Sequence, residues 1–151
     1  MSPTIWGPKV WFLLHRLSFY SDRTDVMGAW KAMIVLLNAA IPCKLCRRHM
    51  QEYCISNPLI FPKGATGAQV RDTIVMWLYK FHNTVNQRNG TGAFEYDFLR
   101  FFYGIGTHAN AVEDCRRVLK EIEALWFPLV AKPWSDSVRH LIGLIGGGTF
   151  G

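Results

Sequence analysis

The chain has 151 residues, half of them apolar, and its 17 Lys and Arg against 11 Asp and Glu give a net charge of +6. This length and apolar content fit one globular domain and exclude a disordered tail, while 13 Gly and 7 Pro without a triplet period exclude a collagen-like chain. The apolar runs are far shorter than the ~20 residues of a bilayer span, and the short run Val10–Leu14 does not resemble a secretory signal. We therefore expect an intracellular protein without a membrane span.

The positive charge alone does not predict a nucleic-acid-binding protein. The basic residues are scattered, with two short clusters only, at Lys44, Arg47 and Arg48 and at Arg116, Arg117 and Lys120. A solvated basic face explains such a distribution better than a nucleic-acid interface. We do not expect nucleic acid as the main partner.

The first third of the chain predicts three helices. The first runs from about Pro8 to Tyr20, with apolar residues at helical spacing. The second runs from about Asp25 to Ala40, and Pro42 ends it because proline is not tolerated inside a helix. The third then begins at or beside Cys43 and runs to about Ile55.

The rest of the chain predicts a loop and further helices. Breakers between Asn57 and Gly67 indicate a surface loop, and helices follow at about 69–88, 94–103 and 111–126. Pro128 and Pro133 are expected to interrupt the helical pattern, and the glycine-rich tail 146–151 is expected to be flexible. The predicted fold is all-α, most simply a small helical bundle with a C-terminal extension.

The motif Cys43-x-x-Cys46 lies in the first turn of the predicted third helix. At that spacing the two Cα atoms lie roughly 5 Å apart, which a disulfide accepts. The free N–H groups of a first turn, with Lys44, Arg47 and Arg48, favour a thiolate. The pair therefore predicts a redox centre.

A zinc site is the competing interpretation. Cys43, Cys46, His49 and Cys54 are suitable ligand types, and a zinc-stabilised basic module could bind nucleic acid or a protein partner without catalysis. However, a continuous helix would spread these four side chains around its axis, so a tetrahedral site would require a break in the helix. We therefore predict no metal site.

Two stripes combine apolar area with hydrogen-bonding groups. On the first helix Trp11 and His15 are four positions apart, and on the fourth helix His82, Val85 and Asn86 form a similar stripe. Such stripes could line the slot of a planar cofactor with polar edges, although each residue taken alone is more often a core residue.

The chain resembles the Erv/ALR flavin-dependent sulfhydryl oxidases through four motifs in the same order. They are Trp6-Gly7, Trp11-x-x-x-His15, Pro42-Cys43-x-x-Cys46 and Trp77-x-x-x-x-His82-Asn83-x-Val85-Asn86. The resemblance covers about Trp6 to Tyr103, and the compact chain is similar to the members that large cytoplasmic DNA viruses carry. It implies a four-helix bundle with a short fifth helix over residues 1–104, followed by a partly helical C-terminal extension over 105–151. It also implies a location in the host cytoplasm or the virion.

The resemblance implies an FAD-linked thiol oxidase that makes disulfides in other proteins and passes electrons to molecular oxygen, giving hydrogen peroxide. The substrate dithiol would attack Cys43, and Cys46 would lie nearer the flavin. Substrate proteins would react directly or through a thioredoxin-like carrier, and the enzyme would be a homodimer. The residues that would contact FAD are Gly7, Lys9, Trp11, His15, Tyr20, Trp77, His82, Asn83, Val85, Asn86 and Arg88.

The chain departs from the family pattern in three places. Tyr79 and Tyr96 stand where many members have a structural disulfide, and Thr91 stands where a lysine often aids the nucleotide phosphates. The second cysteine pair of many cellular members is missing, since Cys54 and Cys115 are single.

Overall fold

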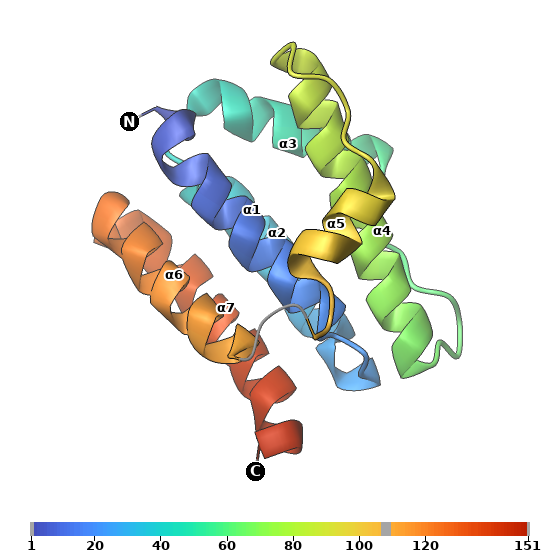
Figure 1. The fold of residues 1–151 in the computed structure, drawn as a ribbon. Helices are drawn as coiled ribbons and strands as arrows, with labels where there is room; N and C mark the ends of the chain where they lie inside the picture. The colour runs from blue at the N-terminus through green and yellow to red at the C-terminus, as the bar shows by residue number, and fades with distance from the viewer. Residues whose placement is uncertain (1, 107–109, 151) are drawn as a thin grey trace.

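The computed structural model describes residues 2–106 and 110–150, and over these residues the chain contains helices and no strand. The predicted all-α fold is confirmed. The helices, drawn in Figure 1, are α1 (Pro3–Phe19), α2 (Met27–Ala40), α3 (Lys44–Ser56), α4 (Gly67–Arg88), α5 (Tyr96–Tyr103), α6 (Ala111–Leu125) and α7 (Pro128–Phe150), with a 3-10 turn at Thr24–Val26.

Two helices begin earlier than the sequence predicted because side chains cap their first turns. In α1 the Ser2 hydroxyl accepts a hydrogen bond from the Thr4 N–H at 3.3 Å, and proline occupies the first turn, where its missing N–H costs nothing. Pro8, the expected start, lies inside the helix. In α4 Thr66 and Gln69 cap each other's backbone N–H groups at 2.9 and 3.2 Å, so the helix starts at Gly67 rather than Gln69.

Gly67 lets the start of α4 approach the chain that follows α1. A Cβ atom at this position would lie 2.3 Å from the carbonyl oxygen of Asp22. No side chain can be placed at that distance without moving the backbone. The glycine therefore fixes how closely α4 packs beside the end of α1.

Helix α1 is the central element. Every residue from Leu13 to Phe19 is buried, which an amphipathic surface helix cannot achieve because one of its faces stays in water. The cause is visible in Figure 1: α1 lies between α4 on one side and α6 on the other. Polar side chains in this stretch bond internally, and Ser18 donates to the His15 carbonyl at 2.7 Å.

The chain after residue 104 is part of the same core. Trp134 on α7 and Cys115 on α6 are fully buried in one hydrophobic cluster with Trp30 of α2 and Leu14 of α1. Helix α7 packs along α2, and α6 packs along α1. The extension therefore packs against two helices of the bundle. The domain boundary at residue 104 stays a prediction.

The expected interruption of the helical pattern is confirmed at Pro128 and is wrong at Pro133. Helix α6 ends at Leu125 and α7 begins at Pro128, a first position where proline is favoured. Pro133 lies inside α7, where its missing N–H removes one backbone hydrogen bond of the helix. Helix α7 continues through the glycine-rich segment to Phe150, and the flexibility of this tail stays a prediction; Gly151 lies outside the described residues.

Within the described part of the chain, no helix combines the length and the apolar character that a bilayer span needs.

Candidate active site

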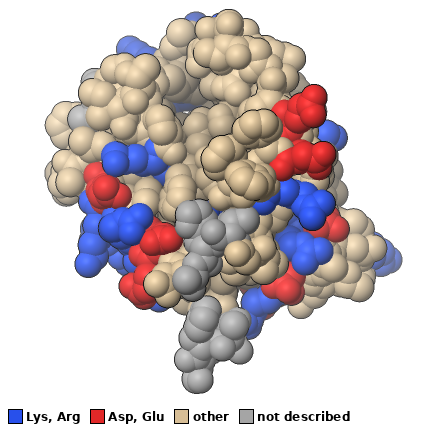
Figure 2. All heavy atoms as spheres, viewed as in Figure 1, with Lys and Arg blue, Asp and Glu red and all other residues tan. Residues whose placement is uncertain are grey.

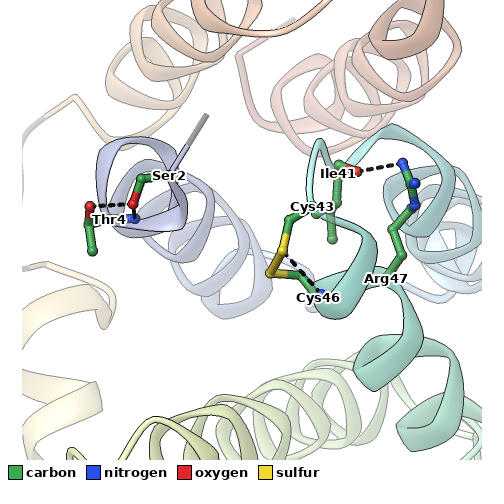
Figure 3. Close-up of a disulfide and its surroundings, with 6 residues drawn as sticks. All are labelled: Ser2, Thr4, Ile41, Cys43, Cys46 and Arg47. Atoms are coloured by element: carbon green, nitrogen blue, oxygen red, sulfur yellow. Dashed lines mark hydrogen bonds between the residues drawn. A yellow bond between two sulfur atoms is a disulfide. The ribbon is translucent and has the colours of Figure 1, made fainter.

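The Cys43–Cys46 pair closes a disulfide where α3 begins, as the sequence predicted for this turn. Cys43 is the N-cap residue with extended backbone angles, Cys46 is the third residue of the helix, and their Cα atoms lie 5.2 Å apart. Figure 3 shows the disulfide at the open end of α3, next to the connection from α2. Both cysteines are partly exposed.

Three hydrogen bonds fix this turn. The Sγ atom of Cys43 accepts the N–H of Cys46 at 3.2 Å, and the carbonyl of Cys43 accepts the N–H of Arg47 at 2.9 Å. The Arg47 guanidinium points back to the connection and donates to the Ile41 carbonyl at 3.0 Å (Figure 3). The sulfur of Cys43 is therefore held by the backbone of the helix that follows it.

The electrostatic setting favours a negatively charged sulfur. Helix N-termini stabilise anions through their free N–H groups, and Cys43 caps such an end. Lys44 and Arg48 in the first turns are exposed and add positive charge. Thiol–disulfide exchange needs a thiolate at each step, and this end of α3 can stabilise one.

The zinc interpretation finds no support. Helix α3 is continuous through His49 and Cys54, and two of the four candidate ligands are bonded to each other. Among residues 2–106 and 110–150, no three His, Cys, Asp or Glu side chains gather in a way that could hold a metal ion.

Trp11 and His15 of α1 meet His82 of α4 in one cluster. The Nε2 atom of His15 and the Nδ1 atom of His82 share a hydrogen bond of 2.8 Å. The Trp11 and His82 rings stack with centroids 3.9 Å apart and planes 4° apart. The structure thus brings together three predicted site residues from the two stripes.

Burial keeps both histidines neutral. It lowers the pKa of His82 from 6.5 to about 4, and it lowers the pKa of His15 well below 6.5, with the nearby His82 as a second cause. One ring must therefore donate and the other accept in their shared hydrogen bond. The other ring nitrogen of His15, Nδ1, is buried and has no hydrogen-bond partner in the structure.

This cluster fits a planar ligand with polar edges. It offers aromatic surface for stacking, and the unpaired Nδ1 of His15 is a buried polar atom of the kind that a ligand can satisfy. Since Trp11 and His82 touch face to face, a ligand would lie beside their stack rather than between the two rings. The residues present therefore suit the flavin that the sequence resemblance implies.

Other predicted residues of α4 hold the surrounding chain. The Asn83 side chain binds the backbone of Phe94 twice, accepting its N–H at 3.0 Å and donating to its carbonyl at 3.3 Å. The Trp77 indole donates to the Asn57 carbonyl at 2.7 Å and so fixes the loop before α4. Val85 packs on the core, the Asn86 carbonyl accepts from Thr91, and Arg88 pairs with Glu52 at 3.4 Å.

Three predicted residues of α1 lie apart from this cluster. Lys9 pairs with Glu121 of α6 at 3.5 Å, on the face of α1 opposite to Trp11. Tyr20, the C-cap residue of α1, packs both on the main core and on the smaller cluster of Phe19, Val75 and Leu99. Gly7 is half-buried, with open space where a Cβ would stand.

Sequence reasoning missed two aromatic neighbours of the histidines. Phe94 lies against His82 with ring centroids 4.7 Å apart, and Tyr103 lies 5.0 Å from His15. Phe94 precedes a short helix without a regular apolar spacing that could have marked it. The Asn83 contact with its backbone is the feature that places it here.

Tyr79 and Tyr96 stand at the two positions where the family pattern has a structural disulfide, and their rings are in contact. The centroids lie 5.7 Å apart in an edge-to-face contact, and the Tyr79 hydroxyl donates to the Phe94 carbonyl at 2.9 Å. An aromatic contact therefore joins α4 to the start of α5.

Comparisons with known proteins agree with the motifs. The model of the Erv1 / Alr family matches residues 8–104. FAD-linked sulfhydryl oxidases of two African swine fever virus isolates are each 34% identical over 86 residues, which cover 55% of this chain and 66% of theirs. Sulfhydryl oxidase 1 of Arabidopsis thaliana is 34% identical over 79 residues, 52% of this chain and 14% of that protein. The chain thus spans just under two thirds of the viral relatives, and no solved structure matches it.

Proposed function

The chain belongs to the Erv1/Alr family, and on this premise we propose that it is an FAD-linked thiol oxidase that forms disulfide bonds in protein substrates. One observation supports the proposal most directly. A disulfide lies partly exposed at the N-terminal end of α3, inside the segment that matches the family.

In the proposed reaction a substrate thiolate attacks the Sγ atom of Cys43. The Cys43–Cys46 bond breaks, a mixed disulfide forms on Cys43, and Cys46 leaves as a thiolate that the end of α3 stabilises. The second substrate thiolate then attacks the substrate sulfur of the mixed disulfide. The substrate leaves oxidised, and Cys43 and Cys46 hold the two electrons as thiolates.

FAD, when bound, would accept this electron pair and deliver it to molecular oxygen, which becomes hydrogen peroxide. The cluster of Trp11, His15 and His82 would hold it by stacking and by the free His15 nitrogen. Gly7, Lys9, Tyr20, Trp77, Asn83, Val85, Asn86 and Arg88 complete the proposed set on the strength of the resemblance alone.

The partners belong to the same proposal. Protein dithiols and oxygen follow from the reaction, whereas a homodimer, a thioredoxin-like carrier and a host-cytoplasm or virion location rest on the resemblance alone. The intermingled charges on the face shown in Figure 2, with basic groups next to acidic ones, give no support to a nucleic-acid-binding function.

Oxygen consumption with dithiothreitol tests the reaction. The purified protein should be yellow and should consume oxygen, and Cys43→Ser and Cys46→Ser should each abolish turnover. The control is Cys54→Ser, which alters a cysteine without a disulfide partner and should keep turnover. A colourless protein that releases zinc on thiol modification would contradict the proposal.

The cofactor site has a test of its own. Replacing His82 and Trp77 together by alanine should lower the ratio of flavin absorbance to protein concentration. Full flavin occupancy in a folded double variant would place the cofactor away from α4.

A further inference from the structure

A pocket of about 280 Å³ opens beside the disulfide, between the α2–α3 connection and the start of α7. Cys43, Lys44 and Arg47 line one side, and Phe127 and Val130 line the other. The second wall lies outside residues 8–104, the segment that matches the family. This chain therefore adds its own surface next to the proposed reaction site.

We propose that this pocket is the substrate docking site, and that it takes a protein segment in which the cysteine is flanked by an apolar residue and an acidic residue. The inference rests on the proposed thiol-oxidase function. It makes Phe127 and Val130 specificity-determining residues.

The choice of cysteine supports substrate entry from this side. Cys43 lines the pocket, and Cys46 is not among its lining residues. The pocket therefore borders the cysteine of the pair that the proposed exchange requires a substrate thiolate to attack.

The wall formed by Phe127 and Val130, at the start of α7, is apolar and exposed. Phe127 is 76% exposed and Val130 50% exposed, although both stand at the pocket rim. Exposed apolar side chains that gather at a concave site are typical of binding surfaces, because water leaves them when a partner binds. The pocket volume, close to the lower limit of ~300 Å³ for small-ligand sites, suits an amino-acid side chain rather than a large cofactor.

The opposite wall is cationic. Lys44 is exposed, Arg47 adds a guanidinium, and the N-terminal end of α3 adds its partial positive charge. An acidic residue and a cysteine thiolate in the substrate match this charge. A second copy of the same face does not, since it would bring the cations of both chains together.

The test uses the full chain with two reduced dithiol peptides that differ in one residue beside the first cysteine, leucine or serine. The double variant Phe127→Ser, Val130→Ser removes the apolar wall. Leu129→Ser is the matched control, because Leu129 is 93% exposed in the same turn and does not line the pocket. All three substitutions lie on exposed or half-exposed side chains, and thermal unfolding checks that the variants stay folded.

The wild-type chain should prefer the leucine peptide by about tenfold in kcat/KM, the discrimination that one small apolar contact provides in a pocket. The double variant should lose this preference and keep its dithiothreitol turnover, and Leu129→Ser should keep both. Both peptides carry a glutamate near the first cysteine, and replacing that glutamate by lysine should lower kcat/KM most at low salt. A preference retained by the double variant, or lost equally in the control, would overturn the docking site.

A binding measurement separates this inference from the proposed function. Fluorescence anisotropy of the same peptides with both cysteines changed to serine should show the same leucine preference in wild type and its loss in the double variant. If the peptides bind in this pattern but the protein shows no turnover of dithiothreitol, the proposed oxidase function is refuted and the docking site is supported. If the double variant instead splits a wild-type dimer and leaves peptide affinity unchanged, the face belongs to a second copy and the proposal is wrong.

Discussion

The neutral histidine pair makes the stability of the fold depend on pH. In the unfolded chain His82 has a pKa near 6.5, and in the fold burial lowers it to about 4. Below pH 6.5 the unfolded chain therefore binds a proton that the folded chain does not. Stability is fully present above pH 6.5 and is lost as the pH falls from 6.5 toward 4.

For His82 alone, proton linkage gives a loss of about 2 kcal/mol in the free energy of unfolding between pH 7.5 and pH 5. His15 acts in the same direction, because its pKa is also lowered, first by burial and then by His82. Urea unfolding of the wild type at the two pH values, with equal flavin content, measures the combined loss of unfolding free energy from His82 and His15. His82→Gln should remove its share of the difference, and His140→Gln, which changes an exposed histidine, should not. An unfolding free energy equal at pH 7.5 and pH 5 would refute the reasoning.

Two further predictions concern the packing of α4 and the order of the sulfurs. Gly67→Ala should lower the free energy of unfolding by roughly 1–3 kcal/mol, because its Cβ would collide with the Asp22 carbonyl. Gly28→Ala, with open space around it in α2, should raise the free energy of unfolding by up to ~1 kcal/mol. Equal urea midpoints for the two variants would contradict this prediction. Cys43→Ser should show a long-wavelength absorbance band from a Cys46 thiolate beside the flavin, and Cys46→Ser should lack it; the reverse result would exchange the two sulfurs.

Local rules predicted the elements better than their contacts. The start of α3 at or beside Cys43 followed from Pro42 and the helical pattern after it, because proline acts over a few residues, and in the structure Cys43 is the N-cap residue. The separation of Lys9 from Trp11 could not be predicted, since it depends on α6 packing against α1 from a distant part of the chain. The same packing buries Arg16, whose guanidinium donates to the Phe102 and Tyr103 carbonyls at 3.0 and 3.3 Å.

The start of α7 shows the same limit. Proline is compatible both with a break and with a first turn, and the neighbouring sequence does not decide between them. Trp134 and the buried residues after it pack α7 along α2, and this packing favours a helix over a break. The pocket beside Cys43 depends on this placement and was not visible in the sequence.

The contact between Tyr79 and Tyr96 matters for the proposed thiol oxidase, which would meet thiols at every turnover. A disulfide between these positions would restrict the unfolded chain and so stabilise the fold by roughly 3 kcal/mol. An aromatic pair contributes about 1 kcal/mol to stability. A bond of that kind could also be reduced by the substrates themselves. The ring contact stabilises the fold less than a disulfide would, but no reductant can break it. The packing of α5 on α4 should therefore be equally stable under reducing and oxidising conditions.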